Sequence, residues 1–167
     1  RTLYKDGDWN TLCLPFDVTD GDTTDDETFS GTPLAGADVR ALTTDEVNGT
    51  TTGFEPATGL LTLNFTSKDA ITEIKAGTPY IIRWERADGY VNDDTHNIVS
   101  PTFDNVTINK SYQDFDSNGV KFLGYYNWQQ FDEENEYILF LGSNNRLYYP
   151  QPSEDPTTHA MHNPSMG

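Results

Sequence analysis

Short runs of alternating hydrophobic and polar residues make up most of this chain, and turn-forming residues separate them. In residues 10–18, Leu12, Leu14 and Phe16 occupy every second position, the spacing of side chains on one face of a β-strand. The period of an amphipathic helix is almost absent. The pattern therefore predicts strands over residues 10–18, 38–43, 60–66, 79–86, 105–110, 120–127, 137–142 and 146–150.

Residue pairs that favour tight turns fall between these runs. Glycine tolerates a positive φ, and Asn or Asp before it favours the two-residue turns of β-hairpins. Residues 143–145 predict a hairpin that joins residues 137–141 to residues 146–149. The other turn signals are Asn48-Gly49, Thr58-Gly59, Asp88-Gly89 and Asn118-Gly119.

Many short strands at this spacing are typical of an all-β fold, and we predict a single antiparallel β-sandwich, with jelly-roll-like connections as one form of it. The 167 residues suit one domain. We assign residues 1–150 to the β-sandwich module and residues 151–167, which show no strand pattern, to a loosely ordered C-terminal tail. The alternating rows predict a core of Leu12, Leu14, Phe16, Leu61, Leu63, Phe65, Ile81, Val106, Ile108, Leu139 and Leu141.

Several short motifs resemble, in the same order, an all-β module repeated in secreted and surface proteins of gut Bacteroidetes. They are residues 3–18 (LYKDGDWNTLCLPFDV), 31–39 (GTPLAGADV), 60–66 (LLTLNFT), 74–84 (IKAGTPYIIRW), 105–108 (NVTI), 140–142 (FLG) and 147–150 (LYYP). The resemblance covers roughly residues 2–150. It implies a non-catalytic extracellular or cell-surface module, covalently linked to neighbouring domains of a larger protein.

The chain departs from this family near its end. A further strand rich in aromatic residues usually follows the Tyr-Tyr-Pro segment, whereas residues 157–162 here read TTHAMH. Either the final strand lies elsewhere or the chain ends before it. Because the sequence starts directly on a strand motif, we expect any secretion signal to lie upstream of it.

The charge of the chain restricts its partners. Ten basic residues stand against 27 acidic ones, which gives a net charge of −17. Phosphate binding needs clustered Lys and Arg, so we expect no nucleic-acid partner. No apolar run is long enough for a transmembrane helix, so we expect no membrane insertion.

Catalytic motifs are lacking. The chain has no Gly-x-Ser-x-Gly turn, and its one cysteine, Cys13, lies in a predicted strand far in sequence from every histidine. A single thiol forms no internal disulfide, and we interpret Cys13 as a small buried strand residue. We therefore predict that the protein is not an enzyme.

An acidic segment in residues 17–30 offers a candidate calcium site. Calcium takes six to eight oxygen ligands, and this segment supplies carboxylates around a glycine that permits a tight wrap. The spacing is not that of an EF-hand, and a flexible, solvated acidic loop is the alternative. The candidate ligands are Asp20, Asp22, Asp25, Asp26 and Glu27.

The aromatic residues provide the strongest indication of function. Consecutive strand residues face opposite ways, so one of Tyr125 and Tyr126 should be exposed. An exposed ring can stack on the C–H face of a sugar, and Asn127 and Gln129 beside Trp128 can bind hydroxyls. Aromatic residues also fill sandwich cores, which is our expectation for Trp84.

Two functions remain open at this stage. The first is binding of a carbohydrate, a neutral polysaccharide in preference to an acidic one, through Tyr125, Tyr126, Asn127, Trp128 and Gln129. The second is an adhesin or structural spacer that binds a protein surface or no ligand. Exposed rings grouped on one surface would favour the first.

Overall fold

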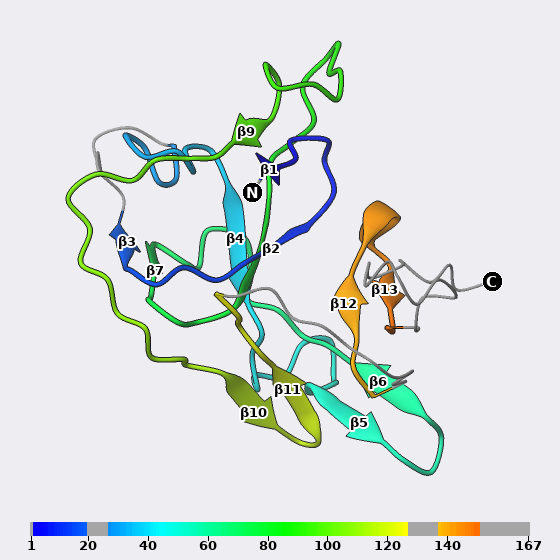
Figure 1. The fold of residues 1–167 in the computed structure, drawn as a ribbon. Helices are drawn as coiled ribbons and strands as arrows, with labels where there is room; N and C mark the ends of the chain where they lie inside the picture. The colour runs from blue at the N-terminus through cyan, green and yellow to red at the C-terminus, as the bar shows by residue number, and fades with distance from the viewer. Residues whose placement is uncertain (1, 20–26, 127–136, 151–167) are drawn as a thin grey trace, which may run out of the picture. The chain divides into compact units, whose positions relative to one another are not determined.

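The computed structural model describes residues 2–19, 27–126 and 137–150. These residues form an all-β structure of small antiparallel sheets, with no α-helix among them (Figure 1). This confirms the predicted all-β class. The strands are β1 (Thr2–Leu3), β2 (Asn10–Leu12), β3 (Val18–Thr19), β4 (Asp38–Ala41), β5 (Gly53–Glu55), β6 (Leu60–Thr62), β7 (Glu73–Ile74), β8 (Tyr80–Arg83), β9 (Ile98–Val99), β10 (Phe115–Ser117), β11 (Val120–Phe122), β12 (Phe140–Leu141) and β13 (Leu147–Tyr148).

The chain divides into two compact units, residues 1–126 and residues 127–167. The first unit contains β1 to β11, and the second contains β12 and β13. The predicted tail, residues 151–167, lies outside the described residues. None of the described residues forms a helix long and apolar enough to cross a membrane.

A three-stranded antiparallel sheet forms the centre of the first unit, with β8 between β2 and β4 (Figure 1). In β2, Leu12 pairs with Tyr80 of β8, and in β3, Val18 pairs with Ile74 of β7. The two pairings share one register, so they are the two ends of a single long antiparallel pairing. The interruption falls around Pro15, which has no N–H to donate to the ladder.

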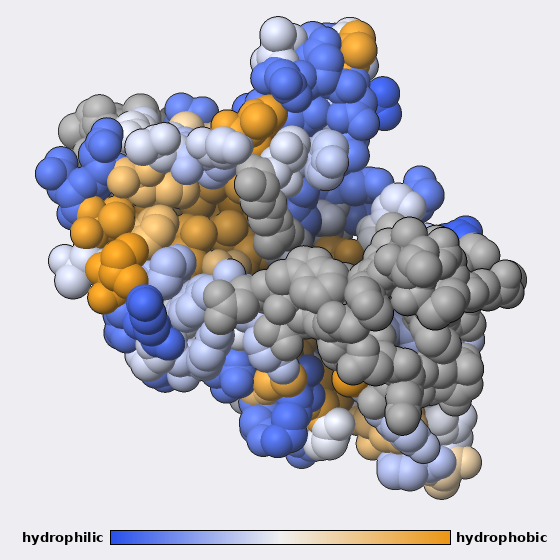
Figure 2. Space-filling view, in the orientation of Figure 1, coloured by the Kyte–Doolittle hydropathy of each residue, from blue (hydrophilic) through white to orange (hydrophobic). Residues whose placement is uncertain are grey.

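The hydrophobic core of this unit is built from β2, β3, β4, β7 and β8 together with residues 29–37. Phe29, Leu34, Ile74 and Ile82 are 1% exposed or less. Trp84 is also buried, as predicted, and its Nε1–H donates to the Ala35 carbonyl at 2.9 Å. Hydrophobic residues also reach the surface over β3 and β7 (Figure 2).

Two of the predicted tight turns, Asn48-Gly49 and Asn118-Gly119, have both central residues at positive φ. Asn48 and Gly49 have φ of 52° and 80°, and Asn118 and Gly119 have φ of 49° and 76°. The Asn118 turn joins β10 to β11. A right-handed strand twist requires this conformation, and Asn-Gly adopts it at low cost.

The predicted strand over residues 105–110 is wrong. The backbone there belongs to no strand, and Asn105 has a positive φ of 56°. Val106 still packs against the core, whereas Ile108 is 55% exposed. The alternation places one side chain inward, but no neighbouring strand pairs with this segment.

The other predicted core positions also divide into buried residues and partly exposed ones. Leu12, Phe16 and Ile81 are buried, and Leu14 packs against the core. Leu61, Leu63, Phe65 and Leu141 are only partly buried, and Leu139 is 41% exposed. The half-buried residues lie on two-stranded sheets or beside them, where one face remains in contact with solvent.

The second unit contains the predicted hairpin. Strand β12 pairs with β13, and a 3-10 turn, η1 (Ser143–Asn145), joins them. Tyr148 is buried and stacks on Phe140 with ring centroids 6.1 Å apart. Asn144 and Asn145 both have positive φ, which the short connection requires.

Candidate functional site

Four backbone segments of the first unit meet around Cys13. The Gly77 N–H donates to the Leu14 carbonyl at 2.8 Å, and the Gln113 N–H donates to the Gly77 carbonyl at 3.0 Å. The Gly124 N–H donates to Asp114 Oδ1 at 3.1 Å. Residues 109–114 are therefore held between the turn before β8 and the chain that leaves β11, without forming a strand.

Three tyrosines form a ring cluster, which we call the tyrosine platform: Tyr112, Tyr125 and Tyr126. Tyr112 and Tyr126 are stacked, with ring centroids 4.7 Å apart and planes at 21°. Tyr125 lies 6.3 Å from Tyr112, with the two planes tilted by 59°. Tyr112 is 42% exposed and Tyr125 is 51% exposed, so two rings of the three are open to solvent.

Tyr126 supports the platform from beneath. Its hydroxyl donates to the Ser111 carbonyl at 3.0 Å and approaches the Leu14 carbonyl at 3.4 Å. The ring is therefore tied to two segments that are far apart in sequence. Since Tyr112 stacks on a ring held in this way, its orientation is set by the fold.

Two glycines allow the segments to approach this closely. A Cβ at Gly77 would overlap the Ser111 carbonyl oxygen, and its φ of +78° disfavours other residues. A Cβ at Gly124 would overlap Cys13 Sγ. The close approach of these two backbones to their neighbours requires glycine.

Cys13 is half-buried immediately after β2, not fully buried within a strand as predicted. Burial raises the pKa of the Cys13 thiol, a hydrogen bond with Tyr126 partly offsets this, and the charge of Asp114 adds to the rise. Burial likewise raises the pKa of the Tyr126 hydroxyl. Both groups are therefore protonated and neutral at pH 7, and Asp114 is a charged neighbour of both.

Of the five predicted ligand-binding residues, the structure describes Tyr125 and Tyr126. Tyr125 is exposed and Tyr126 is half-buried, in agreement with the prediction that one of the two faces outward. Trp128, Asn127 and Gln129 lie outside the described residues. Sequence reasoning missed Tyr112, which lies two residues beyond the predicted strand over residues 105–110; the signal available was an isolated tyrosine between polar residues.

Two tryptophans are less suited to bind a sugar. Trp84 is buried. The Trp9 ring is covered by two guanidinium groups, with Arg83 Cζ 4.4 Å and Arg40 Cζ 5.2 Å from its centroid. Cation–π contacts of this kind occupy the ring and hold it against the central sheet.

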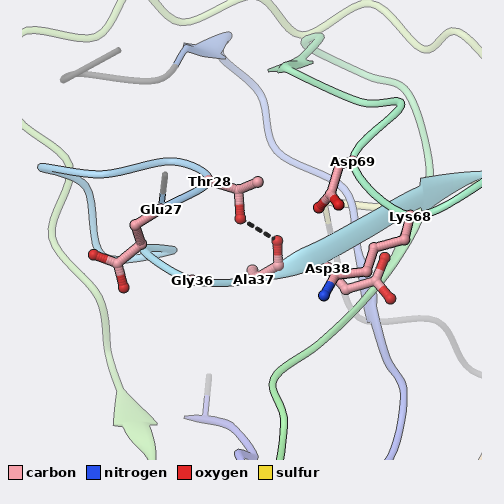
Figure 3. Close-up of a pocket in the computed structure, with 7 residues that line it drawn as sticks. All are labelled: Glu27, Thr28, Gly36, Ala37, Asp38, Lys68 and Asp69. Atoms are coloured by element: carbon pink, nitrogen blue, oxygen red, sulfur yellow. Dashed lines mark hydrogen bonds between the residues drawn. The ribbon is translucent and has the colours of Figure 1, made fainter. Parts of the chain in front are cut away.

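A polar hollow of about 820 Å³ lies elsewhere in the first unit, next to the start of β4 (Figure 3). Asp38 in its wall accepts hydrogen bonds from Arg40, the shorter at 2.8 Å, and Lys68 is 3.8 Å from Glu85. Burial alone would raise the pKa of Asp38, but Arg40 and Arg83 more than offset this and lower it. The lining residues are Glu27, Thr28, Gly36, Ala37, Asp38, Lys68 and Asp69.

The predicted calcium site falls mostly outside the described residues. Asp20, Asp22, Asp25 and Asp26 are not described, and Glu27 lines the polar hollow. No group of three or more His, Cys, Asp or Glu side chains in residues 2–19, 27–126 and 137–150 is placed to hold a metal ion. The calcium site stays a prediction.

Comparison with known proteins provides no relative: no family model, curated protein or solved structure matches the chain.

Proposed function

We propose that this chain is a non-catalytic extracellular module of a larger secreted or cell-surface protein, and that it binds carbohydrate through the tyrosine platform. We further propose that its small sheets pack as a β-sandwich, as in the gut Bacteroidetes module that its motifs resemble. The observation that carries the binding proposal is the pair of exposed rings, Tyr112 and Tyr125, held on a third ring.

The chemistry of the platform suits a sugar. The face of an aromatic ring carries partial negative charge, and the C–H bonds on one face of a pyranose carry partial positive charge. Loops on a rigid scaffold commonly present such binding groups. Backbone hydrogen bonds and Tyr126 hold Tyr112 in place, so binding to that ring costs little side-chain ordering.

The proposed partner is a glycan, not nucleic acid. The net charge of −17 and the charge of Asp114 beside the platform both oppose a polyanion. The rival function is an adhesin or spacer that binds a protein surface or nothing, in which case the rings only pack against one another.

Calorimetry of the 167-residue chain against a panel of soluble plant and host oligosaccharides tests the proposal. We expect Kd values of about 10 μM to 1 mM, typical of one small site whose avidity comes from repeated modules. Tyr125→Ala should weaken binding, and Tyr4→Ala, which removes a similarly exposed tyrosine outside the platform, should not. Absence of binding across the panel would favour the spacer.

A separate variant tests the contribution predicted from sequence. Trp128→Ala should weaken binding if that indole extends the platform. Unchanged affinity in Trp128→Ala, together with a loss in Tyr125→Ala, would place the site on the three tyrosines without Trp128.

A further inference from the structure

The two exposed rings of the tyrosine platform do not lie in one plane. The planes of Tyr112 and Tyr125 meet at 59°, and their centroids are 6.3 Å apart. That separation is comparable to the advance of one sugar unit along a polysaccharide. Two adjacent sugars stacked on these rings would therefore have to turn relative to each other.

Each ring offers a restricted surface. Tyr126 covers one face of Tyr112, so the opposite face and the edges of Tyr112 remain for a ligand. Tyr126 itself is half-buried and its hydroxyl is engaged by backbone carbonyls. The platform thus presents two small facets at an angle, in place of one flat aromatic surface.

The fold fixes the position of Tyr112. Tyr112 lies within residues 109–114, which bond to Pro15, to Gly77 and, through Asp114, to Gly124. Moving Tyr112 toward the plane of Tyr125 would require movement of a segment held at three points. Rotation of Tyr112 would also break its stacking on Tyr126.

From this geometry we infer that the platform binds a single, soluble, neutral glycan chain that bends between consecutive sugars, and does not bind the flat face of a crystalline polysaccharide. This inference rests on the proposed function. A crystalline face presents its sugar rings in one plane, so it can contact one facet at a time. A soluble chain can rotate about its glycosidic bonds and contact both.

The charge near the platform supports a neutral ligand. The Asp114 carboxylate accepts a hydrogen bond from the Gly124 N–H at 3.1 Å, so it lies beside the backbone that leads into Tyr125 and two residues after Tyr112. A uronic acid or sulfated sugar stacked on Tyr112 would be repelled by the same charge.

The test compares soluble and crystalline substrates with the whole 167-residue chain. Affinity electrophoresis would use soluble neutral polysaccharides, namely xyloglucan, galactomannan, mixed-linkage glucan and pullulan, with polygalacturonate plus chelator as the acidic probe. Depletion assays would use microcrystalline cellulose and insoluble chitin. We expect retardation by at least one neutral soluble polymer, and no depletion by either crystalline one.

Variants assign the binding to the two facets. Tyr112→Ala and Tyr125→Ala should each weaken binding about tenfold, equivalent to about 1.4 kcal/mol. The exposed Tyr4→Ala is the matched control and should bind as the parent does. Circular dichroism and the melting temperature show whether each variant is folded. If Tyr112→Ala does not fold, Tyr112→Phe replaces it; this variant keeps the ring and should retain binding.

The outcomes separate the two proposals. No binding to any polymer overturns the proposed function, and this inference with it. Equal or stronger binding to crystalline cellulose or chitin, or to polygalacturonate, overturns this inference and leaves carbohydrate binding intact. Binding that survives both Tyr112→Ala and Tyr125→Ala also overturns it, since the site would then lie elsewhere.

Discussion

Residues 10–19 and residues 105–114 have the same kind of alternating sequence but different structures. The first segment pairs with β7 and β8 in one register and buries Leu12, Phe16 and Val18. The second forms single hydrogen bonds to Pro15 and Gly77 and leaves Ile108 exposed. Alternation therefore predicts an extended backbone in both, but it does not predict that a neighbouring strand is present to pair with it.

The comparison also separates stability from function. The paired segment lies against the core, where side chains are tightly packed. The unpaired segment carries Tyr112 and lies beside Tyr126, so it presents the candidate site. A segment that bonds to several partners at isolated points leaves side chains free to face solvent.

The largest expected effect is at Ile82, at the centre of β8 and fully buried. Ile82→Ala should lower the free energy of unfolding by about 2–5 kcal/mol, because it removes buried methyl groups and leaves a cavity. Ile108→Ala in the unpaired segment should change it by less than about 0.5 kcal/mol. Urea unfolding measures the free energy of unfolding of both variants. Similar losses would show that Ile108 contributes to the core as much as Ile82 does.

The next effect is at Gly77, where the two segments meet. Gly77→Ala should cost at least about 1–3 kcal/mol, because it strains a positive φ and pushes away the Ser111 carbonyl. Gly59→Ala has a similar positive φ of +70° but nothing within 4 Å of the added Cβ. The Gly59→Ala variant therefore measures the cost of the backbone strain alone. Equal losses of unfolding free energy in Gly59→Ala and Gly77→Ala would contradict the close approach at Gly77.

A smaller effect is expected at Asp38, the first residue of β4, which pairs with β8 in the central sheet. Asp38→Asn keeps an acceptor but removes the charge that Arg40 and Arg83 bind, so we expect a loss of about 1–2 kcal/mol at pH 7. The folded pKa is below the unfolded one, so this stabilisation is present above pH of about 4 and is lost as the pH falls further.

The measurement for Asp38 is thermal unfolding of parent and Asp38→Asn from pH 7 down to pH 3. The difference in Tm between them should shrink as the pH falls below about 4. A difference that stays constant over this range would mean that the lowered pKa does not stabilise the fold.

A smaller loss of stability than at Asp38 is expected at Tyr126, in the region around the platform. Tyr126→Phe keeps the ring that supports Tyr112 but removes the hydroxyl bonds to the Ser111 and Leu14 carbonyls. We expect a loss of about 0.5–1.5 kcal/mol in urea unfolding. No change in stability would show that these bonds do not anchor the platform.

The sequence by itself determined the local structure of much of the chain. The all-β class followed from the two-residue period, and the Asn48-Gly49 and Asn118-Gly119 turns followed from the low cost of positive φ at these residues. The hairpin of β12 and β13 followed from the turn residues between them. One of Tyr125 and Tyr126 is exposed, as predicted, although both lie beyond the end of β11 and not in a strand. These features depend on contacts between residues close in sequence.

Only the tertiary structure decided which extended segments pair and which tyrosines meet. The shared register of β2 with β8 and β3 with β7 joins residues 54 to 72 positions apart. Tyr112 reaches Tyr125 and Tyr126 because Gly77 and Gly124 admit backbone and sulfur where a Cβ would clash. Such contacts depend on space left by distant residues, and no local pattern encodes that space.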